Sequence, residues 1–516
     1  MNVFFDFFQS PFKITCYTYF MSKYEYDVII IGAGITGASV ARELSKTTAR
    51  VCFLDKEDDV CCGSSKANSG IVHAGYDPVP GTLMAKYNIR GSEIFEDLSK
   101  KLNFSYQKIG SLVLAFDESG LEKIKSLYER GKTNGVKGLK IVQKDELFEM
   151  EPNLNENVIA ALYAPSAAII SPYEASWAIA ESAVINGATF LRNTAVHAIN
   201  KNQDGFVIST TAGELKAKYL VNAAGLFADK ISMMAGARAY KIIQRKGEYC
   251  LLDNKCSGLV NHVLFQTPGV YGKGVLVTKT VDGNILIGPS AEDLSREKEG
   301  YTGTTSSYQA EILNAARRSV AEIPTRNIIN SFAGIRAIAV EMDGSPINDF
   351  IVEEDKNVPG FINVGGICSP GLTSAPAIGE AVVELLVKAG LKVEKNKGFI
   401  EERKGISSFK NASLQEKTEL IKKDSRYGQI ICRCEMITEG EIVASIHSPI
   451  GAVDLDGVKR RTRAGMGRCQ SGFCSPRVTE IISRELNIPM INVTKKGGTS
   501  YILEAKTRPD ISEVAK

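Results

Sequence analysis

The sequence is poor in several features that define whole classes of protein. Among its 516 residues it has one tryptophan and four histidines, and aromatic residues make up only 8%. Basic and acidic residues nearly balance, 62 against 59, so no bulk field favours nucleic acid or anionic lipid. The longest uncharged run, residues 357–379, is interrupted by Pro, Gly, Ser and Asn and is no membrane-spanning helix. We therefore expect no nucleic-acid partner and no direct membrane insertion.

The start of the chain also lacks the pattern of an export signal. Residues 1–20 are apolar and aromatic, but their first charge is Asp6 and no small-residue cleavage site follows. We expect Met21 to be the working start and residues 1–24 to be an extension. The 11 cysteines then belong to a reducing compartment, where close spacing indicates metal binding before disulfides. The predicted location is cytoplasmic, with any membrane association arising through a partner.

A nucleotide-binding pattern opens the regular part of the chain. The apolar, β-branched run Tyr26–Ile31 predicts a buried strand, and it leads into a G-x-G-x-x-G turn made by Gly32, Gly34 and Gly37. A helical pattern and a second short strand follow, and that strand ends just before Asp55. These glycines permit a tight turn, close approach to a pyrophosphate and close helix packing, while the acid can accept ribose hydroxyls. The pattern therefore predicts a dinucleotide site.

The segment after Asp55 favours a flavin over a nicotinamide, and two further segments add to the pattern. Residues 63–75 form a small, polar loop with one histidine, and residues 222–225 and 365–373 are glycine-rich turns after short strands. Together with the fingerprint, these motifs resemble the D-amino-acid-oxidase-type FAD oxidoreductases. Within them the chain is most similar to bacterial glycerol-3-phosphate dehydrogenases and oxidases, with L-2-hydroxyglutarate dehydrogenase as a near relative. The resemblance covers about residues 25–395 and implies bound FAD.

The expected fold class is α/β (α+β), with three parts. Residues 25–395 form a Rossmann-like FAD-binding domain into which an antiparallel-sheet substrate domain is inserted, at about 84–150, expected to be mostly helical, and 235–330. A charged linker follows at 396–428, then a small iron–sulfur domain at 429–488 and a tail at 489–516. By the resemblance, FAD also contacts Ser69, the Val196 backbone near the adenine, Gly225, and at the pyrimidine end Gly371, Leu372 and Thr373.

Four residues are candidates for the chemistry. Oxidising an alcohol at a flavin needs a base near neutral pKa, and only His73 among the histidines lies in the flavin loop. Ser69 and His73 keep the spacing seen in the resembling oxidases. Arg336 is a lone cation in an apolar strand and suits a carboxylate or phosphate. Lys279 is a possible second cation or an outward-facing strand residue, and Ser369 a hydrogen-bond donor or a plain turn residue.

The last hundred residues carry a cysteine group with a metal-binding pattern. Cys432 and Cys434 form C-x-C, and Cys469 and Cys474 form C-x4-C, so four thiolates can hold zinc or an iron–sulfur cluster. The segment resembles the bacterioferritin-associated-ferredoxin-like domain, which implies a 2Fe-2S cluster, although that ferredoxin has C-x2-C at the second pair. The basic run 459–463 either offsets cluster charge, docks an acidic partner or forms a solvated face.

The leading hypothesis is an FAD-dependent dehydrogenase of glycerol 3-phosphate, a small anionic metabolite, that relays electrons through the cluster to a partner subunit. An L-2-hydroxyglutarate or other 2-hydroxy-acid dehydrogenase is the alternative of the same class. An amine-oxidising subunit would bind its substrate through Arg336 without His73 as base. An electron-transfer or iron-handling module would have no substrate of its own.

Overall fold

The strand expected at the start of the chain lies at the centre of an eight-stranded sheet. The computed structural model describes residues 25–267 and 274–507. In it β1 (Glu25–Ile31) pairs in parallel with β2 (Val51–Leu54) and β12 (Gly213–Asn222). The sheet is completed by β9 (Thr189–Leu191), β10 (Val196–Lys201), β11 (Phe206–Thr210), β19 (Ile351–Glu354) and β20 (Phe361–Gly365). Its central strands are buried on both faces, as parallel strands between two layers are.

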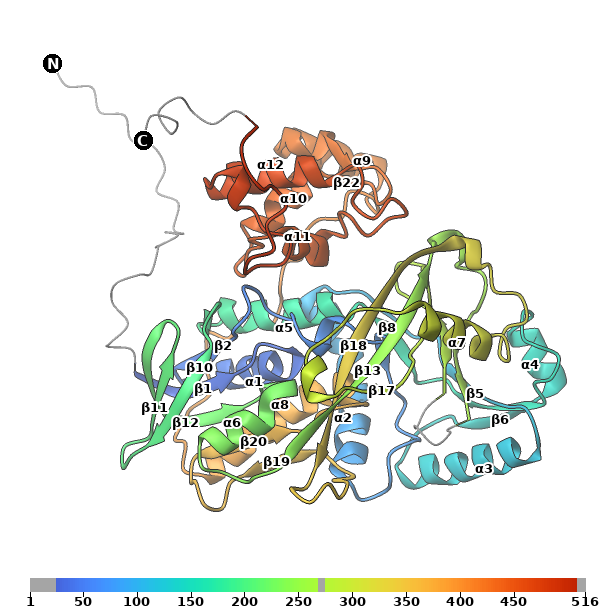
Figure 1. The fold of residues 1–516 in the computed structure, drawn as a ribbon, viewed down its shortest axis with the longest axis horizontal. Coiled ribbons are helices and arrows are strands. Elements are labelled where there is room, and N and C mark those ends of the chain that lie inside the picture. Colours follow the sequence, from blue (N-terminus) through green and yellow to red (C-terminus); the bar gives the residue numbers. More distant parts are fainter. Residues whose placement is uncertain (1–24, 268–273, 508–516) are drawn as a thin grey trace.

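Helices from distant parts of the chain cover this sheet (Figure 1). α1 (Ile35–Ser45) packs between α5 (Pro172–Ile185) and α8 (Gly371–Lys388). α2 (Leu83–Leu102) and α6 (Ala228–Met234) complete the layers. Gly91 of α2 lies so close to α8 that a Cβ there would be 1.9 Å from the Thr373 carbonyl oxygen. This contact places the first turn of α8 against α2 and fixes the segment that leads into it.

A second, nine-stranded sheet stands beside the first. Its axis is a long antiparallel ribbon of β13 (Lys241–Leu252) and β18 (Ile328–Val340), in which Arg245 lies opposite Arg336. The other strands are β5 (Ser111–Ala115), β6 (Lys140–Gln143), β7 (Ala160–Ala164), β14 (Val263–Gln266), β15 (Leu276–Lys279), β16 (Ile285–Gly288) and β17 (Glu292–Asp293), with α3 (Glu118–Thr133), α4 (Lys144–Met150) and α7 (Ser306–Ala316) around them. Only β5 and β14 pair in parallel among the described strands of this sheet. The expected antiparallel sheet is therefore present as the second sheet of the fold.

The stretch 84–150 is mostly helical, as expected, but three strands interrupt it. It contains three helices, but also β5, β6 and the short β4 (Tyr106–Gln107), which joins β3 (Ile71–Val72) and β8 (Ala168–Ile170) in a three-stranded sheet. All five residues of β5 are buried. In a short, fully buried strand, apolar residues do not alternate with polar ones. The sequence of β5 therefore gives no clear strand pattern between the charged helices that flank it.

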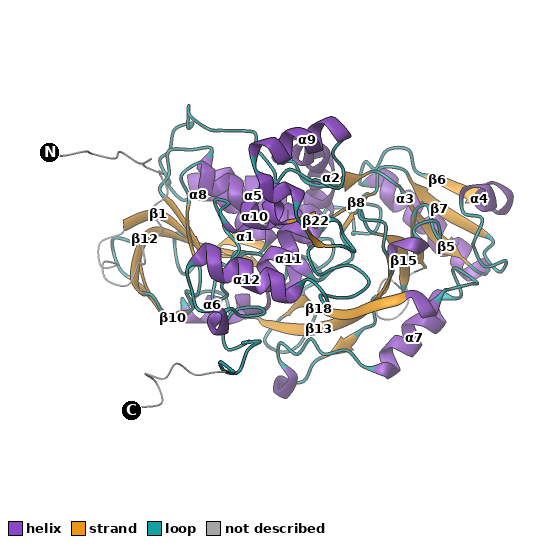
Figure 2. Cartoon of the chain, turned by 90° about the horizontal axis from the view of Figure 1, so that it is seen from above, coloured by secondary structure: helices purple, strands orange, loops and turns teal. Residues whose placement is uncertain are grey.

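The C-terminal part forms its own small core. α9 (Leu414–Lys423) has no buried residue, and after it come β21 (Ile430–Cys432), β22 (Ile437–Thr438), α10 (Glu439–Ile446), α11 (Leu455–Thr462) and α12 (Ser475–Leu486). α11 packs against α5 of the first layer, so the C-terminal part, orange to red in Figure 1, lies against that layer. Seen from above, α10, α11 and α12 lie over α1 and α5 (Figure 2). No helix among the described residues is both long and apolar enough to cross a membrane.

Candidate active site and cysteine centre

Two positions in the turn after β1 have no room for a side chain. Gly32 has a φ of 107°, in the left-handed region, and a Cβ on it would lie 2.3 Å from the Ala223 carbonyl oxygen. A Cβ on Gly37 would lie 1.9 Å from the Gly32 carbonyl oxygen. A side chain at either position would push α1 away from the sheet, so both glycines are needed for the backbone geometry itself.

This turn presents the N-terminus of α1 and a buried carboxylate to the same region. Gly34 caps α1 in extended conformation, and the first turn of the helix contains no acidic residue. The Ile35 N–H donates to Ser65 Oγ at 2.9 Å. Asp55, after β2, accepts a hydrogen bond from the Ala33 N–H at 2.8 Å, and burial raises its pKa. Free N–H groups at a helix start suit a pyrophosphate and the carboxylate suits ribose hydroxyls, so these residues fit FAD.

The other residues predicted to contact FAD lie on the same edge of the sheet. The Thr194 N–H donates to the Asp55 carbonyl oxygen at 2.7 Å, two residues before Val196 begins β10. Gly225 follows β12 with a φ of 56°, and a Cβ on it would meet no atom within 4 Å. Gly371, Leu372 and Thr373 form the first turn of α8. Their roles towards the cofactor stay predictions.

The loop that contains His73 joins the two sheets. Ser64 Oγ donates to the Ile335 carbonyl oxygen of β18 at 2.5 Å, and Ser69 Oγ lies 3.2 Å from the Tyr249 hydroxyl of β13. A Cβ on Gly334 would lie 1.8 Å from the Ala67 carbonyl oxygen, so β18 touches the loop directly. The predicted flavin loop and the predicted substrate strands therefore meet at one place.

His73 is held at this junction by its backbone. Its N–H donates to Thr373 Oγ1 of α8 at 2.9 Å, and its carbonyl oxygen accepts from Asn88 Nδ2 of α2 at 2.7 Å. Its ring stacks on Phe265 with 5.9 Å between ring centroids. The two backbone bonds hold residue 73 beside the first turn of α8, and the imidazole lies against Phe265.

The candidate anion-binding residues differ in their surroundings. Arg336 is mostly buried on β18, where burial lowers its pKa, and its Nη2 donates to the Ser290 carbonyl oxygen at 3.3 Å. Within the described part of the chain it forms no ion pair. Lys279 ends β15 half-buried, also without an ion pair there, and Ser369 is exposed in the turn before α8. Cys368, next to Ser369, is close enough to act on the Arg336 charge, so this turn approaches the guanidinium.

Two aromatic residues at the junction are absent from the sequence prediction. Tyr249 and Phe332 face each other across β13 and β18, stacked with ring centroids 5.0 Å apart. Burial raises the pKa of Tyr249, so its hydroxyl stays protonated beside Ser69. The only sequence signal for them was the alternation of the two strands, which does not distinguish a site residue from a core residue.

The four predicted metal-binding cysteines come together as two pairs. Cys434 Sγ lies 3.5 Å from Cys469 Sγ, and Cys432 is hydrogen-bonded to Cys474. The bond from Cys474, together with N–H groups of Gly465 and Glu435, lowers the pKa of Cys432 to about 6. A thiol so readily ionised by neighbouring donors is prepared to act as a thiolate ligand.

The donor set bears on which metal fits. Cys434 also interacts electrostatically with Cys432, and Cys474 with Cys469, so the two pairs lie near each other. Four cysteine thiolates are the ligands of a 2Fe-2S cluster, in which each of two irons takes two of them. The donor set therefore fits the two-iron cluster.

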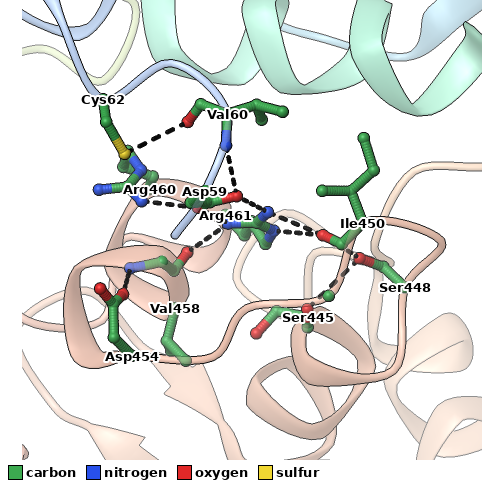
Figure 3. A network of polar contacts seen from close by, with 12 residues as sticks. Asp59, Val60, Cys62, Ser445, Ser448, Ile450, Asp454, Val458, Arg460 and Arg461 are labelled. Carbon is green, nitrogen blue, oxygen red and sulfur yellow. Dashed lines mark hydrogen bonds and ion pairs between the residues drawn. The ribbon is translucent and has the colours of Figure 1, made fainter. Parts of the chain in front are cut away.

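The basic run before the second cysteine pair faces inward. Arg461 Nη1 and Nη2 donate to the two carboxylate oxygens of Asp59 at 2.6 and 2.7 Å, and Arg460 Nη2 donates to the same carboxylate at 2.6 Å (Figure 3). Arg461 also donates twice to the Ile450 carbonyl oxygen. Both arginines are buried, so they do not form the solvated face considered above, and the acid they dock belongs to this chain, four residues after Asp55.

Comparison with known proteins agrees with this two-part site. Residues 27–385 match the FAD dependent oxidoreductase (DAO) family, and residues 430–484 match the BFD-like [2Fe-2S] binding domain. A glycerol 3-phosphate dehydrogenase of Caloramator mitchellensis is 49% identical over 94% of this chain and all of that protein. A glycerol 3-phosphate oxidase of Mycoplasma genitalium is 37% identical over 72% of this chain and 96% of that protein.

A solved structure supports the same assignment. The FAD-bound L-alpha-glycerophosphate oxidase of Mycoplasma pneumoniae superposes with a TM-score of 0.69 at 34% identity, over 74% of this chain and 98% of that one. The fold and the site thus define an oxidoreductase that uses FAD and a 2Fe-2S cluster. The chain belongs to the FAD-dependent oxidoreductase (DAO) family and carries a C-terminal BFD-like [2Fe-2S] domain, which confirms the predicted fold and both cofactors.

Proposed function

We propose that the protein oxidises sn-glycerol 3-phosphate to dihydroxyacetone phosphate and passes the electrons through its 2Fe-2S cluster to a partner subunit. The observation that carries this proposal is Arg336, a mostly buried cation that forms no ion pair within the described residues, at the junction where the His73 loop meets β18. A buried charge without a partner is costly and is retained where a ligand supplies the counter-charge. The two relatives above act on glycerol 3-phosphate by name.

In this proposal Arg336 binds the phosphate and Lys279 adds a second positive charge from β15. Ser369, in the turn before α8, donates a hydrogen bond to the substrate or the cofactor. A guanidinium matches a phosphate because its planar N–H groups can form two parallel hydrogen bonds. The phosphate end is thereby fixed, and the hydroxyl-bearing carbon takes a defined position relative to His73.

His73 accepts the proton of the substrate hydroxyl as the carbon is oxidised. FAD held beside this loop would supply the acceptor for the hydride from that carbon. The proton and the hydride together account for the two hydrogens that the alcohol loses when it becomes a ketone. The backbone contacts of His73 to Thr373 and Asn88 hold the imidazole in place for this transfer.

A 2-hydroxy acid is the second candidate substrate. The L-2-hydroxyglutarate dehydrogenase of Escherichia coli is 29% identical over 396 residues, and a carboxylate would also pair with Arg336. Anaerobic titration of the purified protein separates the two. We expect glycerol 3-phosphate to bleach the flavin absorbance and L-2-hydroxyglutarate to leave it unchanged. Bleaching by the hydroxy acid alone would assign the enzyme to the second candidate, and bleaching by neither would refute both.

The role of His73 has its own test. We expect His73→Ala to lower the rate of flavin reduction by about 10²- to 10⁴-fold, the usual contribution of a general base. His447→Ala is the control, because His447 is exposed in the C-terminal domain and pairs with Glu485. Normal flavin reduction in the His73 variant would exclude it as the base and bring the amine-oxidising alternative forward.

A further inference from the structure

Arg463 ends α11 in an unusual backbone conformation. Its φ is 69°, in the left-handed region, and its N–H donates to the Lys459 carbonyl oxygen at 2.9 Å, which closes the helix. Few residues with a side chain adopt this conformation without a compensating contact. The turn directs the Arg463 side chain away from the helix axis towards the other two parts of the protein.

The Arg463 guanidinium contacts three regions at once. Its Nε donates to Glu435 Oε2 at 3.0 Å in the cysteine loop. Nη1 donates to Asp282 Oδ2 at 2.5 Å and Nη2 to Asn284 Oδ1 at 3.2 Å, both in the turn between β15 and β16. Nη1 also lies 3.4 Å from the Tyr173 hydroxyl on α5. One side chain therefore ties the cysteine loop to the second sheet and to the flavin-binding layer.

Glu435 carries this connection to the cysteines. It directly follows Cys434, its backbone N–H donates to the Cys432 sulfur, and its buried carboxylate is bound to Arg463. The loop is fitted tightly at this point, because a Cβ on Gly467 would lie 2.2 Å from the Cys434 Cβ. A displacement of Arg463 would move Glu435, and with it two of the four cysteines.

The same place borders the flavin loop. A cavity of about 310 Å³ is lined by Ser69 and Gly70 of that loop, by Asp282 and Asn284, and by Arg463 and Met466 of the C-terminal domain. The Tyr173 hydroxyl donates to Met466 Sδ at 3.4 Å across it. The flavin loop, the turn after Lys279 and the cysteine loop thus share one boundary.

We propose that Arg463 is a positioning residue that holds the cluster-binding loop at a fixed place beside the flavin loop, so that electrons cross between the two cofactors within one chain. In this step the reduced flavin loses one electron and the oxidised cluster gains it, and no other reactant takes part. The proposal rests on the proposed function only in requiring a reduced flavin. Arg463 touches neither the substrate nor the reacting atoms.

The test compares Arg463→Met with Arg477→Met in the full-length protein loaded with FAD and cluster. Arg477 is exposed on α12, three residues after Cys474, and pairs only with Glu480 in the described part of the chain, so its loss removes the same charge near the cluster. After anaerobic mixing with glycerol 3-phosphate, absorbance reports flavin reduction and freeze-quench electron paramagnetic resonance reports cluster reduction. For Arg463→Met we expect flavin reduction within about twofold of the wild type and cluster reduction slowed at least about tenfold, since small misplacements of reacting groups have large rate effects.

A second variant separates positioning from folding. Asp282→Asn leaves the C-terminal domain untouched and removes one partner of Arg463 in the second sheet. We expect it to slow cluster reduction in the same direction, and the double variant with Arg463→Met to be no slower than Arg463→Met alone. Equal cluster reduction in the wild type, Arg463→Met and Asp282→Asn would overturn the proposal, as would equal slowing by Arg477→Met.

Failure of the proposed substrate is distinguishable from failure of this inference. Photoreduction of the flavin in the presence of a sacrificial amine donor starts the transfer without any substrate. If glycerol 3-phosphate does not bleach the wild-type flavin, the proposed function is wrong, and the same comparison of variants after photoreduction still decides the role of Arg463. The midpoint potential of the cluster, which we expect to fall in Arg463→Met because the buried Glu435 and the partly buried Asp282 lose their counter-charge, provides a reading that a purely structural role would not move.

Discussion

Arg461 in the C-terminal domain is buried and Arg336 in the second sheet is mostly buried, yet their surroundings are opposite. Arg461 donates to both oxygens of Asp59 and to the Ile450 carbonyl oxygen, and Trp177 of α5 lies 5.2 Å from its guanidinium carbon. Arg336 has one carbonyl contact at 3.3 Å and forms no ion pair in the described chain. The first charge is neutralised inside the fold, while the second is left to be neutralised by something else.

The comparison shows that burial of an arginine does not by itself indicate function. A buried guanidinium paired with a carboxylate joins two parts of the chain, as Arg460 and Arg461 do for the flavin domain and the cluster domain. A buried guanidinium without such a carboxylate keeps the full cost of its desolvation until an anion arrives. The presence of a paired acid, rather than the burial of the arginine, distinguishes the structural site from the binding site.

The strongest test of this distinction is Arg336→Met. We expect kcat/KM for glycerol 3-phosphate to fall about 10²- to 10³-fold, because truncating one partner of a buried charge pair costs about 2–5 kcal/mol. The melting temperature should stay equal or rise, since the variant removes a buried charge that lacks an internal partner. Arg245→Met is the matched control. Arg245 lies opposite Arg336 in the ribbon but pairs with Asp293, and its loss should change kcat/KM by less than about threefold. A large fall in both variants would remove the distinction.

At the paired arginines, Arg460 and Arg461, we expect removal of a charge to lower stability. Asp59→Asn leaves two buried guanidinium groups short of a charge and should destabilise the attachment of the C-terminal domain by about 3 kcal/mol. The arginines hold the Asp59 pKa well below its usual range despite burial, so this stabilisation is present above about pH 4 and is lost only as the pH falls further. Limited proteolysis between the domains at pH 7 measures it. Asp27→Asn, at the exposed pair with Arg50, should cost less than about 1 kcal/mol.

These contrasts also explain what the sequence could predict. The glycine turn and Asp55 lie within about 30 residues, and their spacing follows from the geometry of one strand, turn and helix. The cysteine pattern is similarly local. The partner of Arg461 lies 402 residues away, so the sequence showed a basic run without showing that an acid beside the nucleotide site neutralises it.

The arrangement of the site was less predictable than its members. His73, Arg336 and Ser69 were identified individually, but their meeting depends on the pairing of β13 with β18 and on Ser64 and Ser69 bonding across to those strands. Tyr249 and Phe332 lie in the same ribbon and carry no motif. Long-range strand register, which no local pattern encodes, decides which side chains share the junction.

The smallest expected effect concerns Asp454, an acid near the paired arginines that, like its neighbour Asp58, forms no ion pair within the described residues. Asp454 caps α11 through a bond from the Gly457 N–H, but burial, and after it the neighbouring Asp58, raises its pKa to about 7. Between about pH 4 and 7 the unfolded chain releases this proton and the folded chain keeps it, so the carboxyl lowers stability as the pH rises.

Asp454→Asn keeps the cap and cannot ionise. We expect the variant and the wild type to be equally stable near pH 4, and the variant to be more stable at pH 8 by on the order of 1 kcal/mol. The matched control is Asp117→Asn, because Asp117 caps α3 through the Gly120 N–H with the same spacing but is exposed. Thermal unfolding of both variants across this pH range decides the matter. An increase in stability for Asp454→Asn that is the same at pH 5 and pH 8 would mean that the charge of this carboxylate is compensated in the fold, as that of Asp59 is. The contrast between paired and unpaired buried charges would then not extend to Asp454.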